Sequence, residues 1–171
     1  MMTGMDKLKK KRVLAIASAG GHWVQLQRMR IAWDGCDTVY MTTKEEYREG
    51  LMQDAAARGQ PAPRFYRVVA ANRWQKFRLV RQLVEITLVL LRERPDVIVS
   101  TGAAAGFFAL KFGKIFGART IWVDSIANAE TMSLSGQKAR SCADLWLTQW
   151  EHLSESEAGN ITRPDFKGSV V

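Results

Sequence analysis

Short runs of aliphatic and β-branched residues alternate along the chain with longer segments in which apolar positions recur at helical spacing. The short runs predict six strands, at residues 12–18, 38–43, 65–69, 96–100, 120–124 and 145–148. The longer segments predict helices from about residue 22 and over residues 44–58, 78–92, 103–116 and 136–142. Strands that alternate with helices indicate right-handed βαβ units, so we predict a Rossmann-like α/β fold with helices on both faces of a parallel sheet.

Ligands of such sheets bind beyond the carboxyl ends of the strands, which draws attention to the turns there. After the first strand, Gly20 and Gly21 let backbone amides approach an anion at the start of the next helix, although tight turns also need glycine for geometry alone. The turn matches neither GxGxxG nor a P-loop, which disfavours dinucleotide and NTPase functions. His22 follows directly and could accept a proton or bond a ligand, or be structural.

Two further turns carry small or polar residues. After the fourth strand, Ser100, Thr101 and Gly102 would admit a ligand close to the backbone, whereas the alanines that follow could serve only to pack a helix on the sheet. After the fifth strand, Asp124 could orient or accept a proton opposite His22, or could cap the segment that follows it. The turns predict an anion site at this edge but leave the role of each side chain open.

Composition narrows the class of protein. With 171 residues, 47% of them hydrophobic, the chain has the size of one domain. Cys36 and Cys142 stand alone, so we expect neither a disulfide nor a metal site, and a reducing cytoplasm fits. We read no signal peptide, and the longest nearly apolar stretch, residues 83–91, is about half of what a membrane-spanning helix needs.

The net charge of +8 is concentrated in two segments. Residues 1–12 carry five basic residues and one acidic residue, and residues 72–94 carry six and two. Such segments attract lipid headgroups, nucleic acid or acidic proteins, or they are a solvated tail and an ordinary helix face. The two basic segments lack interleaved exposed aromatic residues on which nucleic-acid bases could stack, so we expect no nucleic-acid partner.

The motifs together resemble the Alg14 family, including its bacterial exopolysaccharide and capsule members of the PssD, EpsE and CpsF type. The segments that carry the resemblance are residues 17–22, 94–102, 123–125, 135–136 and 143–151. It implies one half of a MurG-like GT-B glycosyltransferase, whose other half is an Alg13-like chain that binds the UDP-sugar donor. It also implies a lipid-diphosphate-linked saccharide as acceptor, no cofactor, and a peripheral location on the cytoplasmic face of the inner membrane.

The resemblance assigns roles to residues. His22 matches the histidine of the GGH turn of MurG and is the first candidate for the catalytic base. Asp124, singled out by its position after the fifth strand and not by the resemblance, is the second catalytic candidate. Acceptor and phosphate binding would involve Ser18, Gly20, Gly21, Ser100, Thr101, Gly102, Gly106, Ser125 and Asn128. Membrane contact would involve Arg73, Trp74, Lys76, Phe77, Arg78 and Arg81.

Three parts of the chain are expected: a membrane-contacting basic segment (1–12), the acceptor-side domain (13–160) and a tail that docks onto the partner (161–171). Family members often begin with a membrane-spanning helix, where this sequence has only residues 5–12. Eukaryotic members commonly show Glu-Ser and then Arg after the fifth strand, where this chain has Asp124, Ser125 and Asn128. The main alternative function is a non-catalytic subunit that recruits and activates its partner at the membrane. A less favoured alternative is a small nucleotide- or nucleic-acid-binding module that uses the basic segments.

Overall fold

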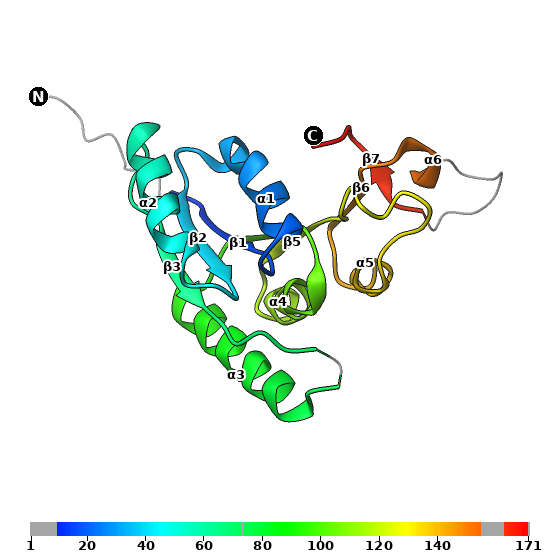
Figure 1. Ribbon diagram of the computed structural model, residues 1–171, viewed down its shortest axis with the longest axis horizontal. Helices are drawn as coiled ribbons and strands as arrows, with labels where there is room; N and C mark the ends of the chain where they lie inside the picture. The colour runs from blue at the N-terminus through cyan, green and yellow to red at the C-terminus, as the bar shows by residue number, and fades with distance from the viewer. Residues whose placement is uncertain (1–9, 73, 155–162, 171) are drawn as a thin grey trace, which may run out of the picture.

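Seven parallel strands form one sheet in the computed structural model, which describes residues 10–72, 74–154 and 163–170. The strands are β1 (Arg12–Ile16), β2 (Asp37–Thr42), β3 (Arg64–Arg67), β4 (Val97–Ser100), β5 (Arg119–Val123), β6 (Leu145–Thr148) and β7 (Asp165–Phe166). They lie in the order β3-β2-β1-β4-β5-β6-β7 (Figure 1). The predicted Rossmann-like α/β fold is confirmed.

Helices cover both faces of the sheet (Figure 1). They are α1 (Gly21–Arg28), the 3-10 helix η1 (Arg30–Trp33), α2 (Tyr47–Ala57), α3 (Lys76–Glu93), α4 (Ala103–Ile115), α5 (Leu134–Ala139) and α6 (Glu151–Ser154). One core cluster joins the sheet to α3, α4 and α5, and the other joins it to α1, η1 and α2. The sheet is therefore the middle layer of three.

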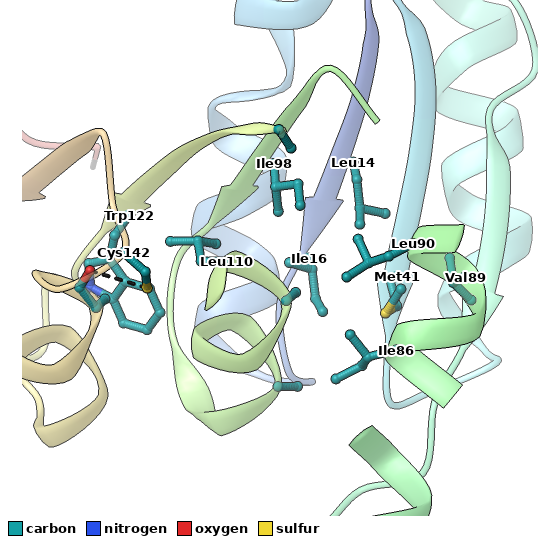
Figure 2. Close-up of a cluster of buried hydrophobic side chains, with 14 of the residues drawn as sticks. Leu14, Ile16, Met41, Ile86, Val89, Leu90, Ile98, Leu110, Trp122 and Cys142 are labelled. Atoms are coloured by element: carbon teal, nitrogen blue, oxygen red, sulfur yellow. Dashed lines mark hydrogen bonds between the residues drawn. The ribbon is translucent and has the colours of Figure 1, made fainter. Parts of the chain in front are cut away.

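Successive side chains of a strand point to opposite faces of the sheet, so in the central strands they belong to different core clusters. In β1, Leu14 and Ile16 point toward α3 and α4, whereas Val13 and Ala15 point toward α1. Figure 2 shows Leu14 and Ile16 among side chains from α3 and α4. The central strands are buried on both faces, which explains their nearly continuous apolar sequences.

The strand order reverses between β1 and β4, which are hydrogen-bonded neighbours although two strands separate them in the chain. The helices that follow them, α1 and α4, begin at the carboxyl ends of these strands. A crevice at such a reversal is the usual ligand site of this fold.

Helix α3 buries some of its polar side chains and exposes some of its apolar ones. Gln82 and Glu93 are buried, whereas Val80, Val84 and Leu91 are exposed. The buried polar groups have partners: Gln82 Nε2 donates to Val69 O at 2.7 Å, and Glu93 pairs with Arg64 and Arg12. Other apolar residues of α3 pack in the core, so the helix carries apolar side chains both there and on its outward surface.

The carboxyl-terminal part belongs to the same sheet. Strand β7 pairs with β6, so the sheet extends beyond the expected domain boundary at residue 160. Ser169 Oγ donates to Gln149 O at 2.7 Å, and Val170 N donates to Gln149 Oε1 at 2.8 Å. At the other end, Arg12 begins β1 rather than closing a separate segment, and residues 1–9 lie outside the described part. Partner docking by the tail stays a prediction.

Candidate functional site

A cleft of about 430 Å³ opens at the carboxyl edge of the sheet, where the strand order reverses. Its walls come from the starts of α1, α4 and α5 and from the loop after β5. The lining residues are His22, Ala103, Ser125, Ala127, Asn128, Ser133, Leu134 and Ser135. Three of the residues predicted for the site, His22, Ser125 and Asn128, are thus brought together from distant parts of the chain.

The His22 ring is fixed by the turn after β4. Its Nδ1 lies 2.9 Å from the backbone oxygen of Thr101, and Thr101 Oγ1 donates to His22 O at 2.6 Å. Because a carbonyl oxygen can only accept, Nδ1 of the neutral ring carries the hydrogen. Nε2 then keeps a lone pair, as a proton acceptor requires.

Gly102 leaves room for this ring. Its backbone has φ +146°, and a Cβ built there would lie 2.3 Å from both Cε1 and Nδ1 of His22. A side chain at this position would displace the imidazole. The glycine of the second turn is therefore required by the histidine of the first turn, a relation between distant residues that spacing alone does not reveal.

Two backbone amides of the turn after β1 donate hydrogen bonds to side chains of the protein. Ala19 N donates to Thr43 Oγ1 at 3.1 Å, and Gly20 N donates to the Tyr47 hydroxyl at 3.2 Å. Gly20 itself has φ +88°, a conformation that suits glycine. The amides that remain suited to an anion are those of the first turn of α1, from Gly21 onward, because they have no intrahelical acceptor.

The hydroxyl groups of the second turn do not reach the cleft. Ser100 and Thr101 are fully buried, and the Ser100 hydroxyl bonds with the backbone of Gly102. Gly106 lies inside α4, where a Cβ would meet Ser100 Oγ at 1.9 Å. This corrects the expectation that these three residues contact a ligand: Ser100 and Gly106 pack the turn against the helix, and Thr101 holds His22.

Asp124 is also buried, with 1% of its surface exposed. Its carboxylate accepts from Ser133 Oγ at 2.6 Å, Ser133 N at 2.8 Å, and both Trp122 Nε1 and Asn128 Nδ2 at 3.2 Å. Gly136 leaves space for it, since a Cβ there would lie 2.7 Å from Oδ1. Of the two roles considered for Asp124, these contacts favour the structural one of holding the segment that follows.

The loop after β5 is further fixed from α6 and its entrance. Trp150 Nε1 donates to Ile126 O at 2.8 Å, and a ring nitrogen of His152 lies 2.6 Å from Ala129 O. Ser125 Oγ accepts from Ala127 N at 3.3 Å. The cleft wall that carries Ser125 and Asn128 is therefore held from several sides.

Sequence reasoning did not identify the wall formed by residues 133–135. Ser133 caps α5 by accepting a hydrogen bond from Gly136 N, and Leu134 is exposed beside it. The signal was a serine three residues before a glycine at the start of a short helix. Ser18, which was expected at the site, is half-buried and does not line the cleft.

The predicted membrane contact residues lie at the start of α3 and on its outward surface. Trp74 and Phe77 are 77% and 94% exposed, and Lys76, Arg78 and Arg81 are exposed beside them. Arg73 lies outside the described residues. In the described part of the chain, none of the helices combines the length and apolar character needed to cross a bilayer.

Comparison with protein families identifies a match over most of the chain. The family model described as "Oligosaccharide biosynthesis protein Alg14 like" matches residues 34–164. A curated protein, the UDP-N-acetylglucosamine transferase subunit ALG14 of Yarrowia lipolytica, is 31% identical over an alignment of 86 residues, and the match covers 47% of this chain and 38% of that protein. The matched family segment contains Asp124 and the cleft wall after β5 but begins after His22.

Solved structures show the same fold. MurG from Acinetobacter baumannii superposes with a TM-score of 0.65 at 12% identity, over 88% of this chain and 44% of that one. UDP-N-acetylglucosamine 2-epimerase from Rickettsia bellii gives a TM-score of 0.60 at 16% identity, over 84% and 40%. The chain spans less than half the length of these relatives and corresponds to one half of a GT-B structure.

Proposed function

The chain belongs to the Alg14 family, and on that premise we propose that it is the membrane-associated, acceptor-binding subunit of a two-chain glycosyltransferase. In this proposal the enzyme transfers a sugar from a UDP donor to a lipid-linked saccharide in polysaccharide biosynthesis. Family membership by itself makes the chain a glycosyltransferase-associated subunit of oligosaccharide biosynthesis. The observation that carries the finer proposal is the cleft in which His22, fixed by Thr101, lies beside two helix N-termini.

The fold and the name of one relative support a partner that supplies the second domain. A GT-B active site lies between two Rossmann-like domains, and this chain supplies one such domain. The Yarrowia lipolytica relative is itself named a subunit. We therefore assign the UDP-sugar to an Alg13-like partner whose domain would close the cleft from the open side.

His22 would act as the base on the acceptor. Its Nε2 would take the proton of the acceptor hydroxyl while that oxygen forms a bond to the anomeric carbon of the donor sugar. The bond between that carbon and the UDP oxygen would break, and UDP would leave with the electron pair. The hydrogen bond to Thr101 O would stabilise the imidazolium that forms, because Nδ1–H remains a donor to it.

The acceptor diphosphate would lie at the starts of α1 and α4. The first-turn amides of both helices have no intrahelical acceptor, and both helix dipoles favour negative charge there. Ser125 and Asn128 on the opposite wall would position the saccharide. This arrangement needs neither a metal ion nor an acidic ligand cluster from this chain.

Helix α3 would attach the subunit to the membrane. Phe77, Val80, Val84, Leu88 and Leu91 are more than half exposed and recur at spacings of three or four residues, which places them on one side. Exposed apolar residues flanked by lysine and arginine are typical of interfacial helices. Exposure of leucine and valine side chains to water is unfavourable, so burial of this side of α3 in the headgroup region would lower the free energy of the membrane-bound state.

The catalytic role is tested by replacing His22 with alanine in the reconstituted pair. We expect the turnover number to fall by about 10² to 10⁴, the usual contribution of a general base, with partner binding retained. The control is Gln53→Ala, which removes an exposed side chain of α2 that does not line the cleft and should keep most of the activity. Turnover of His22→Ala near the wild-type value would instead support the non-catalytic, recruiting subunit.

Membrane attachment is tested by sedimentation with vesicles. The double variant Phe77→Asp/Val84→Asp should lose binding to vesicles that contain phosphatidylglycerol. Ile31→Asp, at a residue 69% exposed on η1, is the matched control and should bind normally. Equal binding by both variants would refute the role of α3, and binding to duplex DNA in place of vesicles would favour a nucleic-acid-binding module.

A further inference from the structure

A second hollow, of about 820 Å³, lies at the opposite edge of the sheet from the cleft. It is formed between the carboxyl-terminal ends of α3 and α4 and the amino-terminal ends of β4 and β5. The lining combines apolar and basic side chains from Lys11, Leu90, Leu91, Arg94, Pro95, Asp96, Val97, Gly113, Phe116, Gly117, Ala118 and Arg119. The proposed transfer reaction uses none of these residues.

Three basic residues and one acidic residue, Asp96, line this hollow. Asp96 lies 3.5 Å from Lys11 and accepts from Arg12 N at 2.8 Å, so its charge is already engaged. Arg94 and Arg119 are exposed, and among the residues that the structure describes neither makes an ion pair. Two guanidinium groups at one hollow are suited to a phosphate, which they bind with paired, charge-assisted hydrogen bonds.

Arg94 occupies a backbone conformation that normally selects glycine. It ends α3 with φ +45° and ψ +61°, in the left-handed region. Just after the end of α4 and its cap Phe116, the residue with a positive φ is a glycine, Gly117, with φ +87°. A non-glycine residue held in this region is a reason to look for a function of its side chain.

The hollow continues into the apolar surface of α3. Leu91 lines it and is also the last of the exposed apolar residues on that helix, at 51% exposure. Phe116 lines it from α4 and is 50% exposed, and Ile115 beside it is 71% exposed. A ligand here would meet cations at one end and hydrocarbon side chains at the other.

We propose that this hollow binds one anionic phospholipid, with its phosphate between Arg94 and Arg119 and an acyl chain along Leu91 and Phe116. The site rests on the membrane association proposed above, because its apolar end adjoins the membrane-facing side of α3. It adds to that association a preference for the headgroup charge. The competing explanation is that the arginines only neutralise the carbonyl ends of α3 and α4.

The test uses the full chain and short-chain lipids below their critical micelle concentration, so that no membrane is needed. Calorimetric titration should show saturable one-to-one binding of dihexanoyl phosphatidylglycerol, at least tenfold tighter than binding of dihexanoyl phosphatidylcholine or inorganic phosphate. Equal affinity for the two lipids would overturn the role of charge. Equal affinity for inorganic phosphate would overturn the role of the acyl chain.

Arg94→Gly separates the side chain from the fold. We expect it to weaken binding of dihexanoyl phosphatidylglycerol at least tenfold while the midpoint of thermal unfolding stays or rises, because glycine relieves the left-handed backbone. Lys111→Gln removes one exposed charge from α4, at a residue that does not line the hollow, and should bind like the wild type. Unchanged binding by Arg94→Gly overturns the site, whereas failure of the proposed function would appear in the vesicle and turnover assays instead.

Discussion

Replacing Gly102 with alanine should damage both the fold and the candidate base. The substitution adds a single methyl group at the entry to α4. That methyl group would lie 2.3 Å from two atoms of the His22 ring, far inside contact distance. The ring therefore has to turn, and Nδ1 loses its 2.9 Å contact with Thr101 O.

The cost has two parts. With φ +146° and ψ −174°, Gly102 lies in a region open essentially only to glycine, where another residue costs about 1 to 3 kcal/mol. Loss of the histidine hydrogen bond adds about 1 kcal/mol. We expect the free energy of unfolding to fall by about 2 to 4 kcal/mol. Gly59→Ala is the control, because Gly59 has φ +65° but no atom within 4 Å of a built Cβ.

Urea unfolding followed by tryptophan fluorescence measures the stability of both variants, and long-range ¹H–¹⁵N NMR identifies the histidine tautomer. In the wild type the neutral His22 ring should carry its hydrogen on Nδ1, and in Gly102→Ala this tautomer should no longer dominate. Transfer by the reconstituted pair should fall with it. If Gly102→Ala lost no more stability than Gly59→Ala and kept the Nδ1–H tautomer, the proposed dependence of His22 on Gly102 would be wrong.

Two further predictions concern the charged cluster at the other edge of the sheet. Glu93→Gln should lower the free energy of unfolding in urea by about 2 kcal/mol, because it removes a buried carboxylate 2.9 Å from Arg64. The control Glu46→Gln, at an exposed residue, should change the free energy of unfolding by less than about 0.5 kcal/mol. Burial raises the pKa of Asp37, but hydrogen bonds from Arg64 and Arg12 outweigh this and lower it. Because the folded-state pKa is lower than the unfolded-state pKa of about 3.9, the ionised carboxylate stabilises the fold at pH values above the unfolded-state pKa. This stabilisation is lost as the pH falls through the folded-state pKa. Stability should therefore drop below about pH 4, and less steeply in Asp37→Asn.

The strands and most helices could be predicted because their sequences fit one local period. Central strands such as β1 are continuous apolar runs that end at glycines, and these signals depend on near neighbours alone. Strand β7 has two residues, Asp165 and Phe166, which are too few to show any period. Its position depends on hydrogen bonds to β6, which only the folded chain supplies.

The site could be predicted as a place but not as a set of contacts. Glycine and hydroxyl residues at strand ends indicated the edge at which the candidate cleft lies, and His22 lines that cleft. Whether a hydroxyl faces solvent or its own turn depends on side-chain packing, as with the buried Ser100. The same limit applies to Asp124, whose four donors come from residues up to nine positions away.

Helix α3 links the two edges of the domain, and its direction decides how a membrane-bound acceptor could reach the cleft. It follows β3 and precedes the parallel strand β4, so it runs antiparallel to the strands. Its first turn, with Phe77, therefore lies toward the edge that carries His22, and its last turn, with Leu91, lies at the edge with the basic hollow. A helix lying in the headgroup region along this length would hold the cleft beside the bilayer surface. In the proposed function, the reactive end of a lipid-linked saccharide would enter from the side while its lipid stays in the membrane. The exposed apolar residues of α3 would then serve attachment, because none of the described helices can span a bilayer.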